Sequence, residues 1–264
     1  MNYLNKTFTT TVFAKTGDVF SGCTFTGGNT TDEAILMIGS ANNVTVTGCT
    51  FKNLLGSGIA VRSSGSGCDN IQIINNRFEN VVSQGVIAKN NLGTRNNTRV
   101  VISGNTFINC GQNTNGKTHA IYAFAPDIQV ISNFIDTTQG NGISIRTSGV
   151  VRYNTVRNAL KSAIRYFSDQ STGASKNLYI EGNVLTGSGV GYPVVSLLDG
   201  GVTSSQMVTN YYIRNNTITG NADTPWFLVE SASFDPKHIE VYDNRLISGI
   251  AANLKYVDVT TAPA

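Results

Sequence analysis

Charge is scarce in this chain of 264 residues, in which Lys, Arg, Asp and Glu together make up 13% of the sequence. The formal net charge is only +3, which excludes a strongly basic nucleic-acid binder of the usual kind. No apolar run is long enough to span a bilayer, and the polar opening stretch MNYLNKTFTT is not a signal peptide. The four cysteines form no Cys-x-x-Cys pair, so a zinc site is not expected.

Proline is also rare, with 5 residues, whereas glycine (27) and asparagine (30) are abundant. Because Asn and Gly favour turns over helix interiors, this composition disfavours a helical protein. Short apolar runs, each closed by polar turn residues, predict many short strands instead. Examples are VTVTG, IQIIN, VVISG and IEVYD.

One motif recurs along the chain at spacings of 21 to 33 residues, which indicates a solenoid. Its copies are SGCTF (21–25), TGCTF (47–51), INNRF (74–78), SGNTF (103–107), ISNFI (131–135), RYNTV (152–156), EGNVL (181–185), NNTI (215–218) and YDNRL (242–246). The same column therefore holds Cys23, Cys49, Asn76, Asn105, Asn133, Asn154, Asn183, Asn216 and Asn244. A second apolar stretch follows about ten residues after each column position, as in GIAVR and GISIR. Since each repeat is too small to bury its own hydrophobic face, stacked repeats are expected to share one core.

The repeated xGNTF…GIxV coil resembles the right-handed parallel β-helix family, the pectate-lyase-like solenoids that include polysaccharide lyases, polygalacturonase-type hydrolases and phage tailspikes. The resemblance implies an all-β fold, a right-handed parallel β-helix of about nine coils over roughly residues 18–258, in a single domain spanning 1–264. An Asn at the same corner of successive coils is expected to bond to the neighbouring coils as an internal ladder. Cys23 and Cys49 share that column, so we expect them to be buried free thiols.

Function is expected on an outer face, because the interior of such a solenoid is filled. Alternation within the second strands predicts that Ile59, Val61, Val86, Ala88, Ile143, Ile145, Ile164 and Tyr166 point inward. The outward side chains combine cations with aromatic rings, a mixture that suits an acidic sugar chain. The candidate substrate-binding residues are Arg62, Lys89, His119, Tyr122, Arg146, Arg165 and Phe167. The alternative is an ordinary solvated face whose Lys and Arg keep sheet edges from aggregating.

Three acidic residues, Asp169, Asp199 and Glu230, leave the second strands of consecutive coils at about the same height. The strand spacing places neighbouring carboxylates ~5 Å apart and the outer pair ~10 Å apart. These separations bracket the ~5–5.5 Å of retaining and ~6.5–9.5 Å of inverting glycosidases. The three acids are therefore candidate catalytic residues of a hydrolase, or else turn residues that simply follow a strand.

β-Elimination of a uronate is the competing chemistry, since it needs a base for the proton at C5 and cations that neutralise the carboxylate. His119 and Tyr122, with Lys89, Arg146 and Arg165, are the candidates for it. The chain shows neither the paired-Asp and Gly-His-Gly signatures of polygalacturonases nor the arginine-rich signature of pectate lyases. No catalytic residue is therefore carried over from the family.

The sequence thus predicts an extracellular polysaccharide-degrading enzyme, with glycoside hydrolysis ahead of elimination. The alternative is a non-catalytic carbohydrate-binding or structural module, such as a spike or fibre domain. The expected partner is a polysaccharide rather than nucleic acid or membrane. No cofactor is required, although the Asp- and Asn-rich loops leave a bound Ca²⁺ open. We expect an extracellular or virion-surface location.

The ends of the chain show no capping helix, which the terminal coils of a solenoid usually need. We therefore expect a fragment of a longer protein, a trimmed chain, or an oligomer whose partners cover the ends. By analogy with tailspikes, that oligomer would be a homotrimer.

Overall fold

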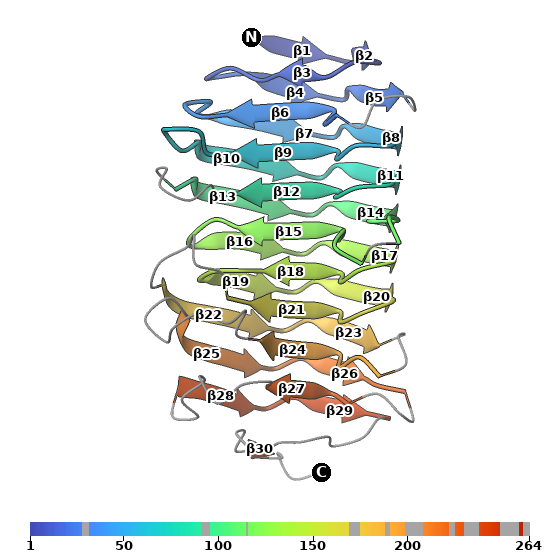
Figure 1. Ribbon diagram of the computed structural model, residues 1–264, viewed down its shortest axis with the longest axis vertical. Coiled ribbons are helices and arrows are strands. Elements are labelled where there is room, and N and C mark those ends of the chain that lie inside the picture. The colour runs from blue at the N-terminus through green and yellow to red at the C-terminus, as the bar shows by residue number, and fades with distance from the viewer. Residues whose placement is uncertain are drawn as a thin grey trace.

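The computed structural model describes residues 1–27, 32–90, 96–114, 116–168, 175–187, 191–198, 208–221, 225–229, 238–248 and 259–260. None of these residues lies in an α-helix, and their strands form three parallel sheets along an elongated solenoid (Figure 1). From β1–β3 to β25–β27, each turn of the chain contributes one strand to sheet A, one to sheet B and one to sheet C, in that order. This arrangement confirms the all-β parallel β-helix expected from the repeats.

The strands of the three sheets are short and pair in register with the equivalent strands of neighbouring turns. Sheet A contains β1 (Asn2–Leu4), β4 (Val19–Ser21), β7 (Val44–Thr47), β10 (Asp69–Ile74), β13 (Thr98–Ser103), β16 (Ile128–Ile131), β19 (Gly149–Arg152), β22 (Ser175–Glu181), β25 (Val208–Arg214), β28 (Ile239–Tyr242) and β30 (Val259–Thr260). Sheet B contains β2 (Thr7–Phe8), β5 (Thr24–Gly27), β8 (Thr50–Leu54), β11 (Arg77–Val81), β14 (Thr106–Cys110), β17 (Phe134–Thr138), β20 (Thr155–Ala159), β23 (Val184–Gly187), β26 (Thr217–Thr219) and β29 (Arg245–Ile247). Sheet C contains β3 (Val12–Phe13), β6 (Ile35–Ile38), β9 (Ile59–Arg62), β12 (Val86–Lys89), β15 (Ile121–Phe124), β18 (Ile143–Ile145), β21 (Ile164–Phe167), β24 (Val195–Leu198) and β27 (Phe227–Val229).

The coils begin upstream of the boundary near residue 18 that the repeats suggest. β1 pairs with β4 in parallel, and β2 pairs with β5, so the segment before residue 18 forms a turn of the same solenoid. The repeat motif is absent from this first turn, where Lys6 stands in the column that Cys23 occupies one turn later.

A ladder of asparagine side chains stacks at the corner between sheets A and B. Asn105 shows the pattern: its Oδ1 accepts the backbone N–H of Asn76 at 2.9 Å. Its Nδ2 donates to the carbonyl of Ile73 at 2.9 Å and to Oδ1 of Asn133 at 3.0 Å. Equivalent contacts recur at Asn133, Asn154, Asn183 and Asn216, which are all buried. The ladder satisfies backbone groups that the corner would otherwise leave buried without partners, which confirms the expected internal Asn ladder.

The residue before each rung of this ladder has a left-handed backbone, which explains the recurrent glycine of the motif. Gly104 has φ 65°, and Gly22, Gly48 and Gly182 are equivalent. Asn75 and Asn215 occupy the same position at φ 55° and 56°. Gly and Asn adopt this conformation at the least steric cost, so the corner accounts for part of the abundance of both residue types.

Cys23 and Cys49 continue the ladder at its N-terminal end. Both are fully buried and neither forms a disulfide, as the shared column predicts. The backbone N–H of Cys49 donates to Oδ1 of Asn76 at 2.9 Å, and that of Cys23 donates to Sγ of Cys49 at 3.4 Å. Burial raises the pKa of the Cys49 thiol to about 11, so the group is a neutral structural side chain.

Aromatic rings stack inside the solenoid beneath sheet B. The column contains Phe8, Phe25, Phe51, Phe78 and Phe107, and neighbouring ring centroids lie 4.6 to 4.9 Å apart. The parallel register brings these rings into line, since Phe51 pairs with Phe78 and Phe78 with Phe107. The interior is thus filled, and a ligand site must lie on the outside.

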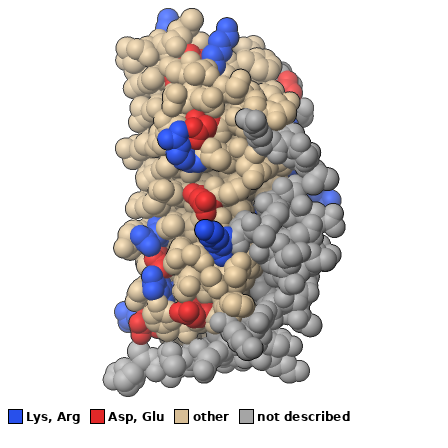
Figure 2. Space-filling view, turned by 90° about the vertical axis from the view of Figure 1, so that its left-hand side faces the viewer, with Lys and Arg blue, Asp and Glu red and all other residues tan. Residues whose placement is uncertain are grey.

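Charged groups of both signs are interspersed on the side of the solenoid shown in Figure 2. Elsewhere on the solenoid as well, charges pair across neighbouring coils, as Arg157 does with Asp136 at 2.9 Å and Arg99 with Asp69. Such exposed ion pairs contribute little to stability. Within the described ranges, no helix is both long and apolar enough to cross a membrane.

Candidate functional site

The outer face of sheet C presents two rows of side chains, because alternate residues of each strand point away from the core. One row contains Ile87, Tyr122, Ser144 and Arg165, which the register pairs in that order. The second row contains Lys89, Phe124, Arg146 and Phe167, two residues further along the same coils. The opposite face is buried as expected, with Ile59, Val61, Val86, Ala88, Ile143, Ile145, Ile164 and Tyr166 in the core.

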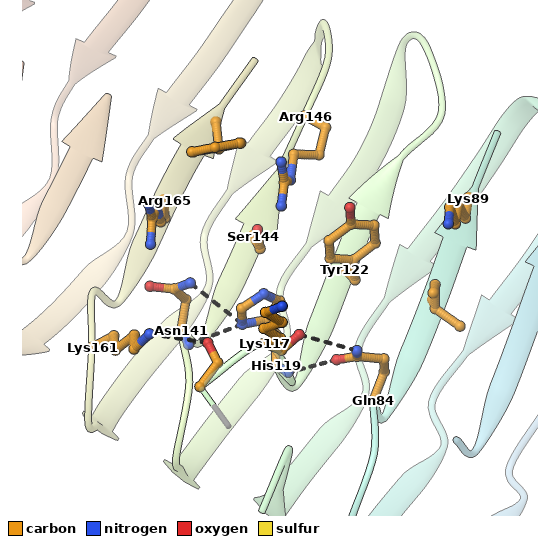
Figure 3. A pocket seen from close by; sticks show the side chains of 13 residues that line it. Gln84, Lys89, Lys117, His119, Tyr122, Asn141, Ser144, Arg146, Lys161 and Arg165 are labelled. Atoms are coloured by element: carbon orange, nitrogen blue, oxygen red, sulfur yellow. Dashed lines mark hydrogen bonds between the residues drawn. The ribbon is translucent and has the colours of Figure 1, made fainter. Parts of the chain in front are cut away.

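A groove of about 540 Å³ opens on this face over β12, β15, β18 and β21 (Figure 3). Its floor is formed by the two rows, and its side is formed by the turns that precede the same strands. The residues that matter most for its chemistry are Gln84, Lys89, Lys117, His119, Tyr122, Asn141, Ser144, Arg146, Lys161, Arg165 and Phe167.

The side of the groove is a strap, the segment 111–119, of which all residues except position 115 are described. The strap crosses the next coil so closely that a Cβ on Gly140 would lie 1.7 Å from the carbonyl oxygen of Thr118. On one side Oε1 of Gln84 accepts the backbone N–H of His119 at 2.6 Å. On the other, Nζ of Lys161 donates to the carbonyl of Gly116 at 3.1 Å. Gly116 and His119 are therefore both fixed, which holds His119 itself and Lys117 between them at the groove.

His119 is held as a neutral hydrogen-bonding group. Its side chain is buried, and Nδ1 accepts the backbone N–H of Asn141 at 3.1 Å. Burial, followed by the positive charges of Arg146, Arg165 and Lys161, lowers the pKa of His119 to about 3. With Nδ1 occupied as an acceptor, the ring proton resides on Nε2. His119 can thus donate a hydrogen bond but is poorly placed to take up a proton.

Cations and aromatic rings alternate across the floor. The guanidinium carbon of Arg146 lies 4.3 Å from the ring centroid of Phe167 and 5.1 Å from that of Tyr122. The guanidinium of Arg165 also faces Phe167, at 5.1 Å. Ser144 lies between these groups and is 1% exposed. Its hydroxyl has no hydrogen-bond partner among the described residues. A buried hydroxyl of this kind is a polar group still available to a ligand.

The structure brings together six of the seven residues that the sequence marks as substrate-binding. Lys89, His119, Tyr122, Arg146, Arg165 and Phe167 all line the groove. Arg62 is the exception, because it forms an ion pair with Glu33 and does not line the groove. The candidate catalytic acids Asp169, Asp199 and Glu230 lie outside the described residues. Their role stays a prediction.

Sequence reasoning missed the groove residues that lie in turns or that have small side chains. Gln84, Asn141 and Lys161 each stand two or three residues before a strand of sheet C, and Ser144 faces outward without charge. Aligning the turns before the second strands would have placed the first three on the same side of sheet C. It would not have shown that a longer turn in one coil folds over them.

A metal centre is not formed by the described residues, since none of their His, Cys, Asp and Glu side chains gather in groups of three or more. Bound calcium therefore stays a prediction.

Acid is expected to destabilise the fold through His119. The pKa of about 3 in the folded state lies below the ~6.5 of an unfolded histidine, so only the unfolded chain gains this proton as pH falls. The free energy of unfolding should thus decrease from about pH 6.5 toward pH 3. Melting temperatures of wild type and His119→Gln across this range should show a shallower slope in the variant. His238→Gln, which changes the other histidine, serves as the control, and equal slopes in all three proteins would contradict the assignment.

Comparison with known proteins identifies the fold. A family model described as "right handed beta helix region" matches residues 33–218. The A-module of the Azotobacter vinelandii mannuronan C-5 epimerase AlgE4 is 12% identical, with a TM-score of 0.55 over 100% of this chain and 88% of that one. The Streptococcus pneumoniae surface protein and adhesin PfbA is 11% identical, with a TM-score of 0.55 over 98% of this chain and 77% of that one. No curated protein matches the chain significantly. Because the family model covers most of the chain, this protein belongs to the right-handed parallel β-helix family.

Proposed function

We propose that this protein acts on an acidic polysaccharide bound in the sheet C groove, by removing a proton next to a uronate carboxylate. One observation carries the proposal: five cations, Lys89, Lys117, Arg146, Lys161 and Arg165, line a groove whose floor holds Tyr122 and Phe167. None of the described lining residues is acidic. Such a surface attracts a polyanion, and its rings offer apolar faces to sugar rings.

The cations support elimination because the reaction builds negative charge on the sugar. When the proton at C5 leaves, charge spreads onto the carboxylate, and fixed guanidinium groups beside it stabilise that state. The C4–C5 double bond then forms as the glycosidic C4–O bond breaks, and the leaving oxygen takes up a proton. The guanidinium carbons of Arg146 and Arg165 lie 4.3 and 5.1 Å from the ring centroid of Phe167, so both cations occupy the same part of the floor. The Ser144 hydroxyl and Nε2–H of His119 add neutral donors to the same region.

Tyr122 is the best candidate for the group that moves the proton. Nδ1 of His119 already accepts a hydrogen bond from the backbone N–H of Asn141, and the groove lysines, as ammonium groups, lack a lone pair. The phenol oxygen of Tyr122 can both release and accept a proton, and its ring lies at the centre of the groove (Figure 3).

Hydrolysis, which the sequence placed ahead of elimination, depends on Asp169, Asp199 and Glu230. The described part of the groove supplies its cations and rings but no carboxylate, so we place elimination first. The names of the two structural neighbours, an epimerase of mannuronan and a surface adhesin, are compatible with an enzyme or with a binding module. We propose an extracellular or surface location on the same grounds.

A panel of acidic and neutral polysaccharides tests this function. Wild-type protein should bind acidic polymers, more weakly as salt rises, and should release new reducing ends together with the ultraviolet absorbance of unsaturated uronates. The double variant Arg146→Ala/Arg165→Ala should bind at least about 10-fold more weakly, because a hydrogen bond to a charged group contributes about 1.5–3 kcal/mol. Arg77→Ala/Arg157→Ala, which removes two exposed arginines of sheet B, is the matched control and should bind as wild type.

The outcomes separate the candidate functions. Reducing ends without unsaturated products would establish hydrolysis and direct attention to Asp169, Asp199 and Glu230. Binding without products would establish a carbohydrate-binding module. No binding to any acidic polymer would contradict the proposal.

A further inference from the structure

The exposed floor of the groove ends at β21, on its C-terminal side. In the first row Arg165 is followed by Ser196 of β24, and in the second row Phe167 is followed by Leu198. Neither residue lines the groove, and with Ser196 2% exposed and Leu198 9% exposed the described floor ends at β21. A long chain that lies on the floor must therefore leave sheet C at β21.

The turn side of the same coils remains open. Tyr192, in the segment just before β24, is 41% exposed. Nζ of Lys161, which lines the groove, lies 5.8 Å from the Tyr192 ring centroid. Lys161 thus has the groove and the strap on one side and an exposed aromatic ring on the other.

At the N-terminal end of the groove, the open surface lies toward the C-terminal ends of the sheet C strands. On β9 the first-row residue Ala60 is fully buried, whereas the second-row side chain of Arg62 is 42% exposed, beside exposed Lys89 on β12. The open surface therefore begins in the second row at Lys89, crosses Tyr122 and Arg165 in the first row, and ends in the turns at Lys161. Figure 3 shows Lys89 and Lys161 at opposite corners of the groove.

We infer that a bound polysaccharide crosses sheet C diagonally and that Tyr192 forms an outer sugar subsite beyond the strap. This inference rests on the proposed function and adds to it a path and a site. A flat phenol ring next to an ammonium group suits the apolar face of an acidic sugar, with the cation near its carboxylate. From Ser144 to Tyr192 the path crosses two strands and four residues along a strand, up to about 16 Å. Only oligosaccharides of several residues can span it.

The test compares long and short oligosaccharides, size-fractionated from the acidic polymer that wild-type protein binds, by isothermal titration calorimetry. Tyr192→Ala should bind the long oligosaccharides about 3- to 10-fold more weakly and the short ones as wild type, since an aromatic contact contributes about 0.5–1.5 kcal/mol. Tyr192→Phe keeps the ring and should bind both as wild type. Tyr153→Ala, which removes another exposed tyrosine at the corner between sheets A and B, is the control and should change neither affinity.

Failure of this inference is distinguishable from failure of the proposed function. Undiminished binding of long oligosaccharides by Tyr192→Ala overturns the subsite, and so does an equal loss for long and short ones. If in either case Arg146→Ala/Arg165→Ala still loses binding of long and short oligosaccharides, the proposed function of the groove is supported without the Tyr192 subsite. Wild-type protein that binds no acidic oligosaccharide overturns both.

Discussion

Replacing Asn105 by alanine is expected to lower the free energy of unfolding by about 3 to 5 kcal/mol. The substitution leaves several buried polar groups without a hydrogen-bond partner, and each such group costs about 1–3 kcal/mol. The backbone N–H of Asn76 loses its acceptor, and the carbonyl of Ile73 and Oδ1 of Asn133 lose a donor. Urea denaturation followed by circular dichroism would measure the change.

Two variants provide the comparison for Asn105→Ala. Asn105→Cys should fold and lose less stability, since Cys23 and Cys49 fill the same column elsewhere in this chain. Asn109→Gly removes an amide four residues away, which donates to Oδ1 of Asn80 on the exposed corner. Because Asn109 has φ 54°, glycine suits its backbone, and the loss should stay below about 1 kcal/mol. Equal losses at positions 105 and 109 would refute the structural role of the buried ladder.

Replacing Tyr122 by phenylalanine is expected to lower the rate of elimination by about 10²- to 10⁴-fold, the usual contribution of a positioned acid or base. The ring remains beside Arg146, so affinity for the polymer should stay within about 2- to 3-fold of wild type. Initial rates from unsaturated-product absorbance, with binding measured separately on the same preparations, would separate these effects.

The control for Tyr122→Phe is Tyr179→Phe, which removes a phenol from the outer face of sheet A. Tyr179 stacks on Tyr212 at a centroid distance of 4.8 Å, outside the groove. Its variant should turn over substrate as wild type. Full activity in Tyr122→Phe would transfer the proton step to another group. A loss of affinity matching the loss of rate would instead make Tyr122 a binding residue.

The repeated column predicted the solenoid because one turn of a β-helix is too small to fold alone. Asn, Gly and Cys in register therefore report the stacking of turn on turn, and the two-residue period of the second strands reports which side chains face the core. These features are local or periodic. They correctly predicted parallel sheets, buried free thiols at Cys23 and Cys49, and the outward direction of Lys89, Arg146, Arg165 and Phe167.

The sequence by itself thus determined the architecture and the face that carries cations and rings. Only the tertiary structure decided how that face becomes a groove. The strap folds over the next coil and is fastened at His119 by Gln84 and at Gly116 by Lys161, which lie 35 and 45 positions away in the sequence. It also decided that Arg62 pairs with Glu33 and that His119 stays neutral. The burial and the protonation of a side chain such as His119 depend on neighbours from several coils. The repeat period of the sequence does not encode which turn folds over which coil.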